Sequence, residues 1–265
     1  MIKLWGEYLK NQLKCLIKYR MTFWASIFNI AIKTLAMGMV WQAVYKQQEI
    51  QMQYNVREML IYSTTSIALA QCMTWWDGPH MYTLNSVKKG TIIFDVIRPI
   101  NFFVQLFCRG SSEFLLNLFV YFFPTMCFGN LVFDLQIKLD RFVIMFFISV
   151  ILGYLILFGF QLLLSMVSVI TLELDGILLL FHAVVMLLAC ETVPLEMYPV
   201  FLQKVIVNLP FRYIFFFPLT IIIEKINLDT FINSIIVEIA WIFLLFIIIG
   251  FGWNKIKKHI CIQGG

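Results

Sequence analysis

The sequence predicts an all-α integral membrane protein with six transmembrane helices, an N-terminal amphipathic interfacial helix and outer re-entrant helices before the last span. Of its 265 residues, 61% are hydrophobic, and they gather in about six apolar stretches near 20 residues long. That length is one helical crossing of a hydrocarbon core roughly 30 Å thick. The stretches lack the alternating pattern of a β-barrel, so helices must satisfy the backbone hydrogen bonds within the lipid.

The basic residues are distributed unequally between the two sides of the membrane. Twelve of the twenty Lys and Arg residues, with six of the fifteen acidic ones, fall on the side that holds both ends of the chain. The net charge there is about +6, against about −1 on the other side. By the positive-inside rule we expect both termini to be cytoplasmic. The basic charge is thus a topology signal, and a nucleic-acid partner is not expected.

Residues 1–20 form the first expected element, an amphipathic helix on the cytoplasmic leaflet. At about 100° per residue, one face is apolar and the other charged. The apolar face holds Trp5, Tyr8, Leu9, Leu13 and Leu16, and the charged face holds Lys3, Glu7, Lys10, Lys14 and Lys18. A membrane anchor and a contact for a partner protein both fit this helix.

The remaining residues, 21–265, form one six-span membrane domain. The spans are expected at residues 21–45, 59–76, 112–132, 142–167, 176–190 and 231–252. The cytoplasmic segment 77–110 joins the second and third spans, and a cytoplasmic tail, 253–265, ends the chain. Helix-breaking pairs such as Gly78-Pro79 and Arg98-Pro99 occur within segment 77–110. A cytoplasmic helix is expected there, with residues 101–110 lying along the interface.

The segment 191–229 precedes the last span and is both apolar and rich in proline. It contains Pro194, Pro199, Pro210 and Pro218, together with Arg212 and several aromatic residues. Such a segment is too apolar for a hydrated loop and too broken for a crossing. We therefore expect short helices that dip into the outer leaflet.

Two full charges fall well within expected spans. Lys33 lies about midway through the first span, and Glu238 about a third of the way into the sixth. Each costs a few kcal/mol at the bilayer centre, so each should face the bundle, a partner or a wet cavity. A role in a translocation pathway and a purely structural contact are both open, as is a pairing of the two charges.

Catalytic chemistry is not indicated. The sequence has no phosphate-binding GxxxxGK[ST] loop, no dinucleotide fingerprint, no HExxH and no GxSxG. Its six cysteines are scattered and form no disulfide framework or metal spacing. We expect no catalytic residue, no metal ligand and no cofactor bound by this chain.

Two sequence blocks resemble a known family. Directly after the second span, residues 86–99 read SVKKGTIIFDVIRP, and before the last span come Pro194-Leu195, Tyr198-Pro199 and the run LPFRY at 209–213. Both blocks are similar to ABC-2 type ABC transporter permeases, in the bacterial branch with six spans and a Gly-Gly end. The resemblance covers nearly the whole chain. It departs at the inner turn 171–175, where the expected tryptophans are absent.

The resemblance implies a permease subunit of an ATP-driven exporter. Cytoplasmic ABC ATPase subunits would bind ATP and Mg, and a second permease, identical or homologous, would complete the dimer. By resemblance, the coupling region that seats in the ATPase comprises Lys88, Lys89, Gly90, Asp95, Arg98 and Pro99. We expect Val87, Ile92 and Val96 to supply the apolar part of this contact. The segment around Pro194, Pro199, Pro210 and Arg212 would cap the pathway on the outer side.

The expected substrate is hydrophobic or amphipathic, such as a drug, a peptide or a lipid-like molecule. The alternative is a non-transporting membrane interaction or immunity protein. An intramembrane enzyme is disfavoured because catalytic residues are missing.

Overall fold

The computed structural model describes residues 2–47, 53–73, 78–136, 141–223 and 226–256, and every regular element within these ranges is helical. The first α-helices are α1 (Ile2–Lys18), α2 (Arg20–Gln47), α3 (Val56–Cys72), α4 (Pro79–Lys88), α5 (Ile92–Ile97) and α6 (Phe102–Asn117). They are followed by α7 (Phe123–Phe133), α8 (Arg141–Thr171), α9 (Asp175–Leu188), α10 (Val200–Val207), α11 (Phe216–Ile222) and α12 (Leu228–Ile256). A π-helix, η1 (Leu118–Phe122), joins α6 to α7, and 3-10 turns occur at η2 (Leu195–Met197) and η3 (Pro210–Tyr213).

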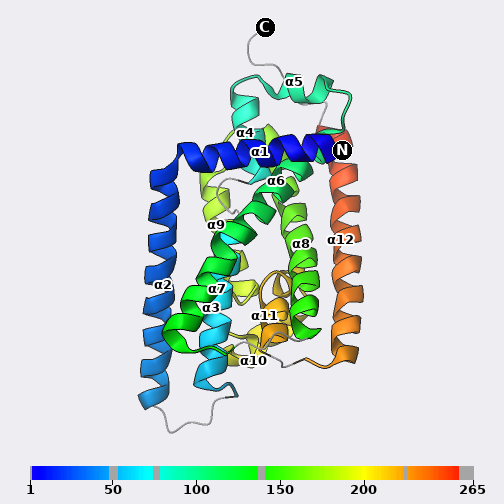
Figure 1. Ribbon diagram of the computed structural model, residues 1–265. Helices are drawn as coiled ribbons and strands as arrows, with labels where there is room; N and C mark the ends of the chain where they lie inside the picture. Colours follow the sequence, from blue (N-terminus) through cyan, green and yellow to red (C-terminus); the bar gives the residue numbers. More distant parts are fainter. Residues whose placement is uncertain (1, 48–52, 74–77, 137–140, 224–225, 257–265) are drawn as a thin grey trace.

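The amphipathic helix α1 lies across one end of the bundle, while α2 and α12 run along its two sides (Figure 1). Trp5 and Leu9 are half-buried and Lys10 and Lys14 are exposed, so the apolar face is turned toward the protein. The helix packs on α6, and the hydroxyl of Ser112 donates a hydrogen bond of 3.4 Å to the carbonyl oxygen of Trp5. The apolar face of α1 is therefore shared with the bundle. Its place in the headgroup layer stays a prediction.

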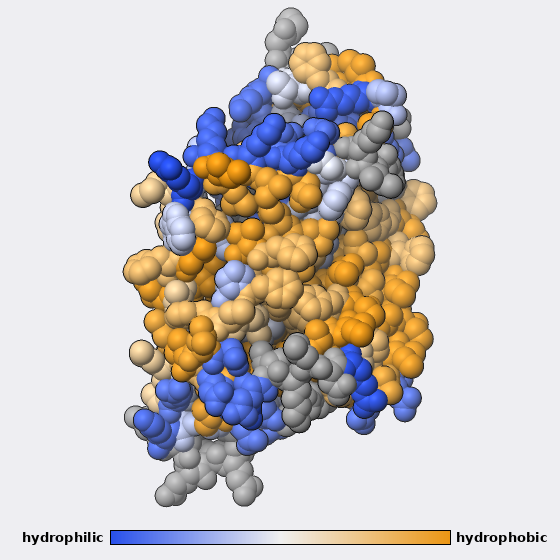
Figure 2. All heavy atoms as spheres, viewed as in Figure 1, coloured by the Kyte–Doolittle hydropathy of each residue, from blue (hydrophilic) through white to orange (hydrophobic). Residues whose placement is uncertain are grey.

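The surface supports a multi-pass membrane protein. In Figure 2 a broad apolar belt separates two polar ends on the face shown. Four described helical runs are long and apolar enough to cross a membrane, at 20–46, 102–133, 141–171 and 228–256. A fifth is added if α10 and the run 210–222, which meet at 80°, count as one broken span. Six full spans are not confirmed.

The two expected spans that fall short differ from the others in length and surroundings. Helix α9 has 14 residues, which reach only about 21 Å. Helix α3 has 17 residues and reaches about 26 Å, and it buries a run of four hydroxyl residues, Ser63 to Ser66. Because α3 is enclosed by other helices, its side chains face protein rather than lipid. The remainder of the predicted second span, 74–76, lies outside the described residues.

The third span corrects an expectation. We expected residues 101–110 to lie along the interface, but α6, η1 and α7 form one helical run from Phe102 to Phe133. Asn101 starts this run directly, because its Oδ1 accepts a hydrogen bond of 2.9 Å from the N–H of Phe103. The π-turn η1 comes just before Pro124, and such a turn lets a helix continue past a local disruption of its hydrogen bonds.

Helix α8 forms the centre of the bundle and packs against α4, α11 and α12. Phe146, Leu157 and Leu162 on this helix are fully buried. Gly153 allows an especially close approach, because a Cβ there would lie 2.5 Å from the carbonyl oxygen of Tyr213 on η3. The core therefore joins α8 tightly to the proline-broken segment.

Candidate functional site

The segment expected to contact an ATPase forms two short helices at the end of the molecule that carries α1. Helix α4 begins at Pro79 and ends at Lys88, and α5 extends beyond α1 (Figure 1). Between them Gly90 has a φ of 68°, and its N–H donates a hydrogen bond of 3.0 Å to the carbonyl oxygen of Val87. This left-handed conformation ends α4 and strains any residue with a Cβ. Gly90 thus sets the direction in which α5 leaves α4.

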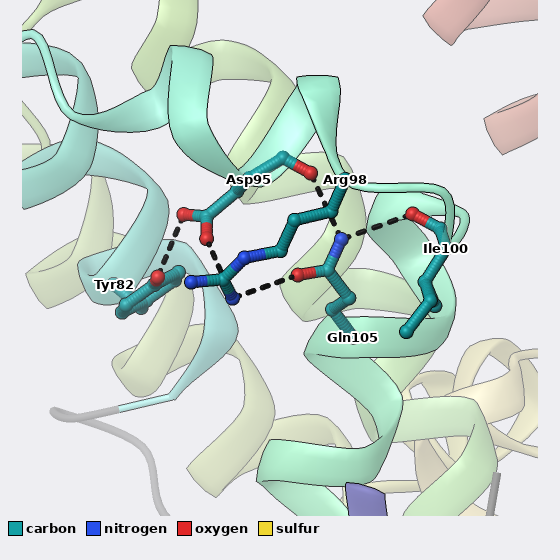
Figure 3. A network of polar contacts seen from close by, with 5 residues as sticks. All are labelled: Tyr82, Asp95, Arg98, Ile100 and Gln105. Atoms are coloured by element: carbon teal, nitrogen blue, oxygen red, sulfur yellow. Dashed lines mark hydrogen bonds and ion pairs between the residues drawn. The ribbon is translucent and has the colours of Figure 1, made fainter.

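A polar network fixes α5 to its neighbours (Figure 3). The hydroxyl of Tyr82 on α4 donates a hydrogen bond of 2.7 Å to Oδ2 of Asp95 on α5, and Nη1 of Arg98 lies 3.3 Å from Oδ1 of Asp95. Nη1 of Arg98 also donates to Oε1 of Gln105 on α6, at 3.4 Å. The Nε2 of Gln105 donates to the backbone carbonyls of Asp95 and Ile100, at 2.9 and 3.0 Å. Asp95, only 5% exposed, is the centre of a joint between α4, α5 and α6.

The Tyr82 hydroxyl is held in its protonated form. Burial raises the pKa of Tyr82 above its usual value of 10, and the hydrogen bond to Asp95 raises it further. The guanidinium of Arg109 lies 4.2 Å from the centre of the Tyr82 ring and opposes this shift. The hydroxyl therefore remains a donor to Asp95 at neutral pH.

The outer face of α5 carries an apolar surface that we call the tip, formed by Phe94, Val96 and Ile97. Phe94 is 68% and Ile97 75% exposed, and Val96 is also exposed. The flanking Lys88, Lys89, Arg98 and Pro99 are exposed as well. Sequence reasoning expected Val87, Ile92 and Val96 as the apolar contact. Ile92 is instead buried in the main core, because α5 turns this residue inward, and Val87 near the end of α4 is half-buried against the same core.

A cavity of about 700 Å³, here called the inner chamber, lies between α1, α2, α3, α6 and α9. Its charged and titratable lining residues are Lys33, Glu113, His182 and Glu191, with Gln12, Gln71 and Asn117 adding neutral polar groups. Lys33 and Glu191 interact electrostatically. Lys33 is central in α2 and Glu191 lies in the turn after the short helix α9, so the pair links this turn to the middle of α2.

A second cavity of about 490 Å³, the vestibule, lies between α1, α4 and α6. It is lined by Tyr82, Lys89, Arg109 and other polar groups. Gln12 and Glu113 line both cavities. The vestibule therefore adjoins both the α4–α5 joint and the inner chamber.

The two intramembrane charges singled out from the sequence lie in different environments. Lys33 lines the inner chamber, whereas Glu238 on α12 is fully buried beside Ser149 on α8. Within one chain the structure brings Lys33 to Glu191, and Glu238 is not part of the chamber lining. A pairing of Lys33 with Glu238 of a second subunit stays a prediction.

The proline-broken segment lies at the end of the bundle opposite α1 (Figure 1). Pro194 and Pro199 directly precede η2 and α10, and Pro210 begins η3, so each proline starts a short helix. Arg212 donates from Nη2 to the hydroxyl of Tyr213 at 2.9 Å, and its Nε is buried and finds no hydrogen-bond partner in the part of the chain that the structure describes. The short helices expected from the sequence are present. Their depth in the outer leaflet stays a prediction.

Sequence reasoning did not single out several residues of these sites. Tyr82 and Gln105 carried no signal, because a lone tyrosine or glutamine is common in any helix. Glu191 was assigned to the outer segment, and no sequence pattern indicated that it lines the same chamber as Lys33. Among the described residues no three His, Cys, Asp or Glu side chains gather as metal ligands.

Comparison with known proteins identifies the family. Residues 30–264 match the model of the ABC-2 family transporter proteins. None of the curated proteins compared matches the sequence. Because the match covers most of the chain, it applies to both the α4–α5 segment and the proline-broken segment. The chain belongs to the ABC-2 transporter family, and it is a multi-pass permease subunit of an ABC transporter that associates with an ABC ATPase.

Proposed function

We propose that this permease exports a hydrophobic or amphipathic substrate, such as a drug, a peptide or a lipid-like molecule, driven by a separate ATPase. ATP and Mg are bound by the ATPase, and this chain contributes no catalytic residue. The observation that carries the proposal is the tip of α5, an exposed apolar surface on a rigid joint at the end of the bundle.

The tip suits a contact that transmits motion. Exposed apolar side chains favour binding to a hydrophobic groove, and the surrounding Lys88, Lys89 and Arg98 steer an acidic partner. The network around Asp95 holds α5 to α4 and α6. A displacement of the tip is therefore transmitted to α4 and α6 rather than taken up by a flexible loop.

The proposed membrane topology and the placement of the cavities together favour outward transport. With both termini in the cytoplasm of a bacterial cell, α1 and α5 face the ATPase. The vestibule and the inner chamber both have linings from α1 and thus lie toward that side. A substrate loaded there is released on the other side after passing the proline-broken segment. A second permease, identical or homologous, completes the pathway.

The proposal is tested with the permease co-expressed with the ABC ATPase of the same transporter. Phe94→Asp and Ile97→Asp should each reduce co-purification of the ATPase about tenfold or more, because a charge must then enter an apolar contact. Phe94→Leu and Ile97→Leu are the matched controls and should keep the ATPase bound. The amount of permease in the membrane should be equal for all four variants.

Inside-out vesicles then test direction. ATP should drive a fluorescent amphipathic probe into the vesicles with the wild type and the leucine variants, and not with the aspartate variants. Normal ATPase binding by both aspartate variants would contradict the assignment of the tip. ATP-driven loss of probe from the vesicles would contradict export.

A further inference from the structure

The inner chamber has the size and the mixed lining of a site for a small amphipathic molecule. Its volume of about 700 Å³ lies within the range of ligand pockets, roughly 300–1,000 Å³. Leu16, Ile30 and Met186 supply apolar surface, and Tyr19, Phe23 and Tyr121 supply aromatic rings. The rings of Phe23 and Tyr121 lie 6.1 Å apart, so α2 and η1 form one aromatic wall.

The charges of the chamber favour a cation over an anion. Its lining holds two carboxyl groups, Glu113 and Glu191, against one lysine, Lys33, and one histidine, His182. Lys33 interacts with Glu191 and so offsets that carboxyl group. Aromatic faces also attract cations, and more strongly where water is excluded. The carboxyl groups and the aromatic rings of the chamber therefore both favour a cation.

Charges in the vestibule reinforce this preference. On the other side of Glu113, the vestibule carries Lys89 and Arg109. These two basic groups repel a cation and hold it on the chamber side of Glu113. An anionic molecule would instead be attracted by Lys89 and Arg109 in the vestibule and repelled by Glu113.

We propose that the inner chamber is a binding site for amphipathic cations, molecules with an apolar body and a positively charged nitrogen or phosphonium centre. The apolar body lies against the aromatic wall and the aliphatic lining, and the charge lies toward Glu113 and Glu191. This inference rests on the proposed function, because it names the substrate class that the exporter carries.

The test compares two probes of nearly the same shape and opposite charge, tetraphenylphosphonium and tetraphenylborate. Binding of each to the full-length permease in nanodiscs of zwitterionic lipid is measured by equilibrium dialysis, with empty nanodiscs subtracted. Tetraphenylphosphonium should bind at least about tenfold more tightly than tetraphenylborate. This comparison within the wild type does not depend on whether any variant folds.

Three variants then locate the site. Glu113→Gln and Glu191→Gln should each weaken tetraphenylphosphonium binding about tenfold, whereas Lys33→Met should strengthen it. Glu173→Gln, which removes an exposed carboxyl group outside the chamber, is the matched control and should change nothing. Thermal melting of each variant shows whether a loss of binding is a loss of folding.

Each outcome decides the proposal. Equal binding of the two probes, tighter binding of tetraphenylborate, or binding unaffected by both glutamine substitutions in folded protein would overturn it. These results would leave the proposed function standing if the aspartate variants of the tip still lose the ATPase. Conversely, cation binding as expected without any ATPase association would contradict the proposed function and not the chamber site.

Discussion

The hydroxyl of Ser149 on α8 donates a hydrogen bond of 3.2 Å to Oε1 of Glu238 on α12, at a point where Glu238 is fully buried. The second oxygen, Oε2, is buried and has no hydrogen-bond partner among the described residues. A buried carboxyl group with one hydrogen bond is costly, more so when ionised. Ser149 and Glu238 therefore form an energetically strained link between two long membrane helices.

Replacing Glu238 by glutamine should stabilise the protein. The amide oxygen still accepts the hydrogen bond from Ser149, and no charge has to be buried, so the melting temperature in detergent should rise. Ser149→Ala should lower stability by about 1–3 kcal/mol, because it removes the one hydrogen bond of the buried carboxyl group. Asp229→Asn, at an exposed position of the same helix, is the control and should have little effect. A glutamine variant that is less stable and inactive would instead show that transport needs the carboxyl group.

Loosening the joint around Asp95 should uncouple hydrolysis from transport. Tyr82→Phe removes the 2.7 Å hydrogen bond to Asp95, worth about 1 kcal/mol, so transport per ATP hydrolysed should fall about fivefold at most. Asp95→Asn should have a similar effect, because it also removes the ion pair with Arg98. Transport and ATP hydrolysis are measured together in proteoliposomes. Tyr8→Phe on α1 is the matched control and should leave the ratio unchanged.

The effect of Tyr82→Phe on this ratio should not change with pH near neutrality. Its folded pKa is raised above the unfolded value of about 10. The contact is therefore fully present below that pH and is lost only as the pH rises through the higher folded value. Wild type and Tyr82→Phe should thus differ by the same factor across about pH 6–9. A difference that disappears within this range would contradict a protonated Tyr82.

Two glycine substitutions should have opposite effects. In Gly153→Ala the new Cβ would lie 2.5 Å from the carbonyl oxygen of Tyr213, so backbone must move, at a cost of about 1–3 kcal/mol. In Gly250→Ala on α12 the new Cβ meets nothing within 4 Å, and the helix gains up to about 1 kcal/mol from the better helix former. Thermal melting in one detergent checks both. Equal melting temperatures would contradict the close approach of α8 and η3.

Charge exchange distinguishes two possible partners of Lys33. Lys33→Glu should impair the permease, and adding Glu191→Lys should restore more function than adding Glu238→Lys, because Lys33 and Glu191 share the inner chamber. Transport in vesicles is the measurement, with permease amount as the control. Better rescue by Glu238→Lys would indicate that Lys33 meets Glu238 of a second subunit.

Much of the helical architecture could be predicted from hydropathy. Lipid offers no hydrogen-bond partners, so an apolar span must form its backbone hydrogen bonds internally, as a helix does. The long helices α2, α8 and α12 are apolar all round and were predicted nearly to their ends. Span number is harder to predict. Helix α3 buries Ser63 to Ser66 against other helices and α9 is short, and neither property is visible in a count of apolar residues.

Features of the sites that depend on the local sequence alone could be predicted. Gly90 ends α4 as a left-handed glycine should, and Lys88, Lys89 and Arg98 are exposed around α5. The rest depends on contacts between distant segments. Gln105 reaches α5 only because the chain folds back after Pro99. Glu191 and Lys33 line the same chamber although 157 residues separate them in the sequence, and no local pattern encodes that proximity.

Helix α8 is 31 residues long, a stiff rod of about 46 Å. Toward one end Leu164 shares a buried cluster with Leu84 of α4, and further along Gly153 lies against Tyr213. A displacement of α4 should therefore be carried along α8 to the proline-broken segment, because one continuous helix joins the two contacts. We therefore expect the proposed ATPase contact and the proposed outer cap to move as one unit.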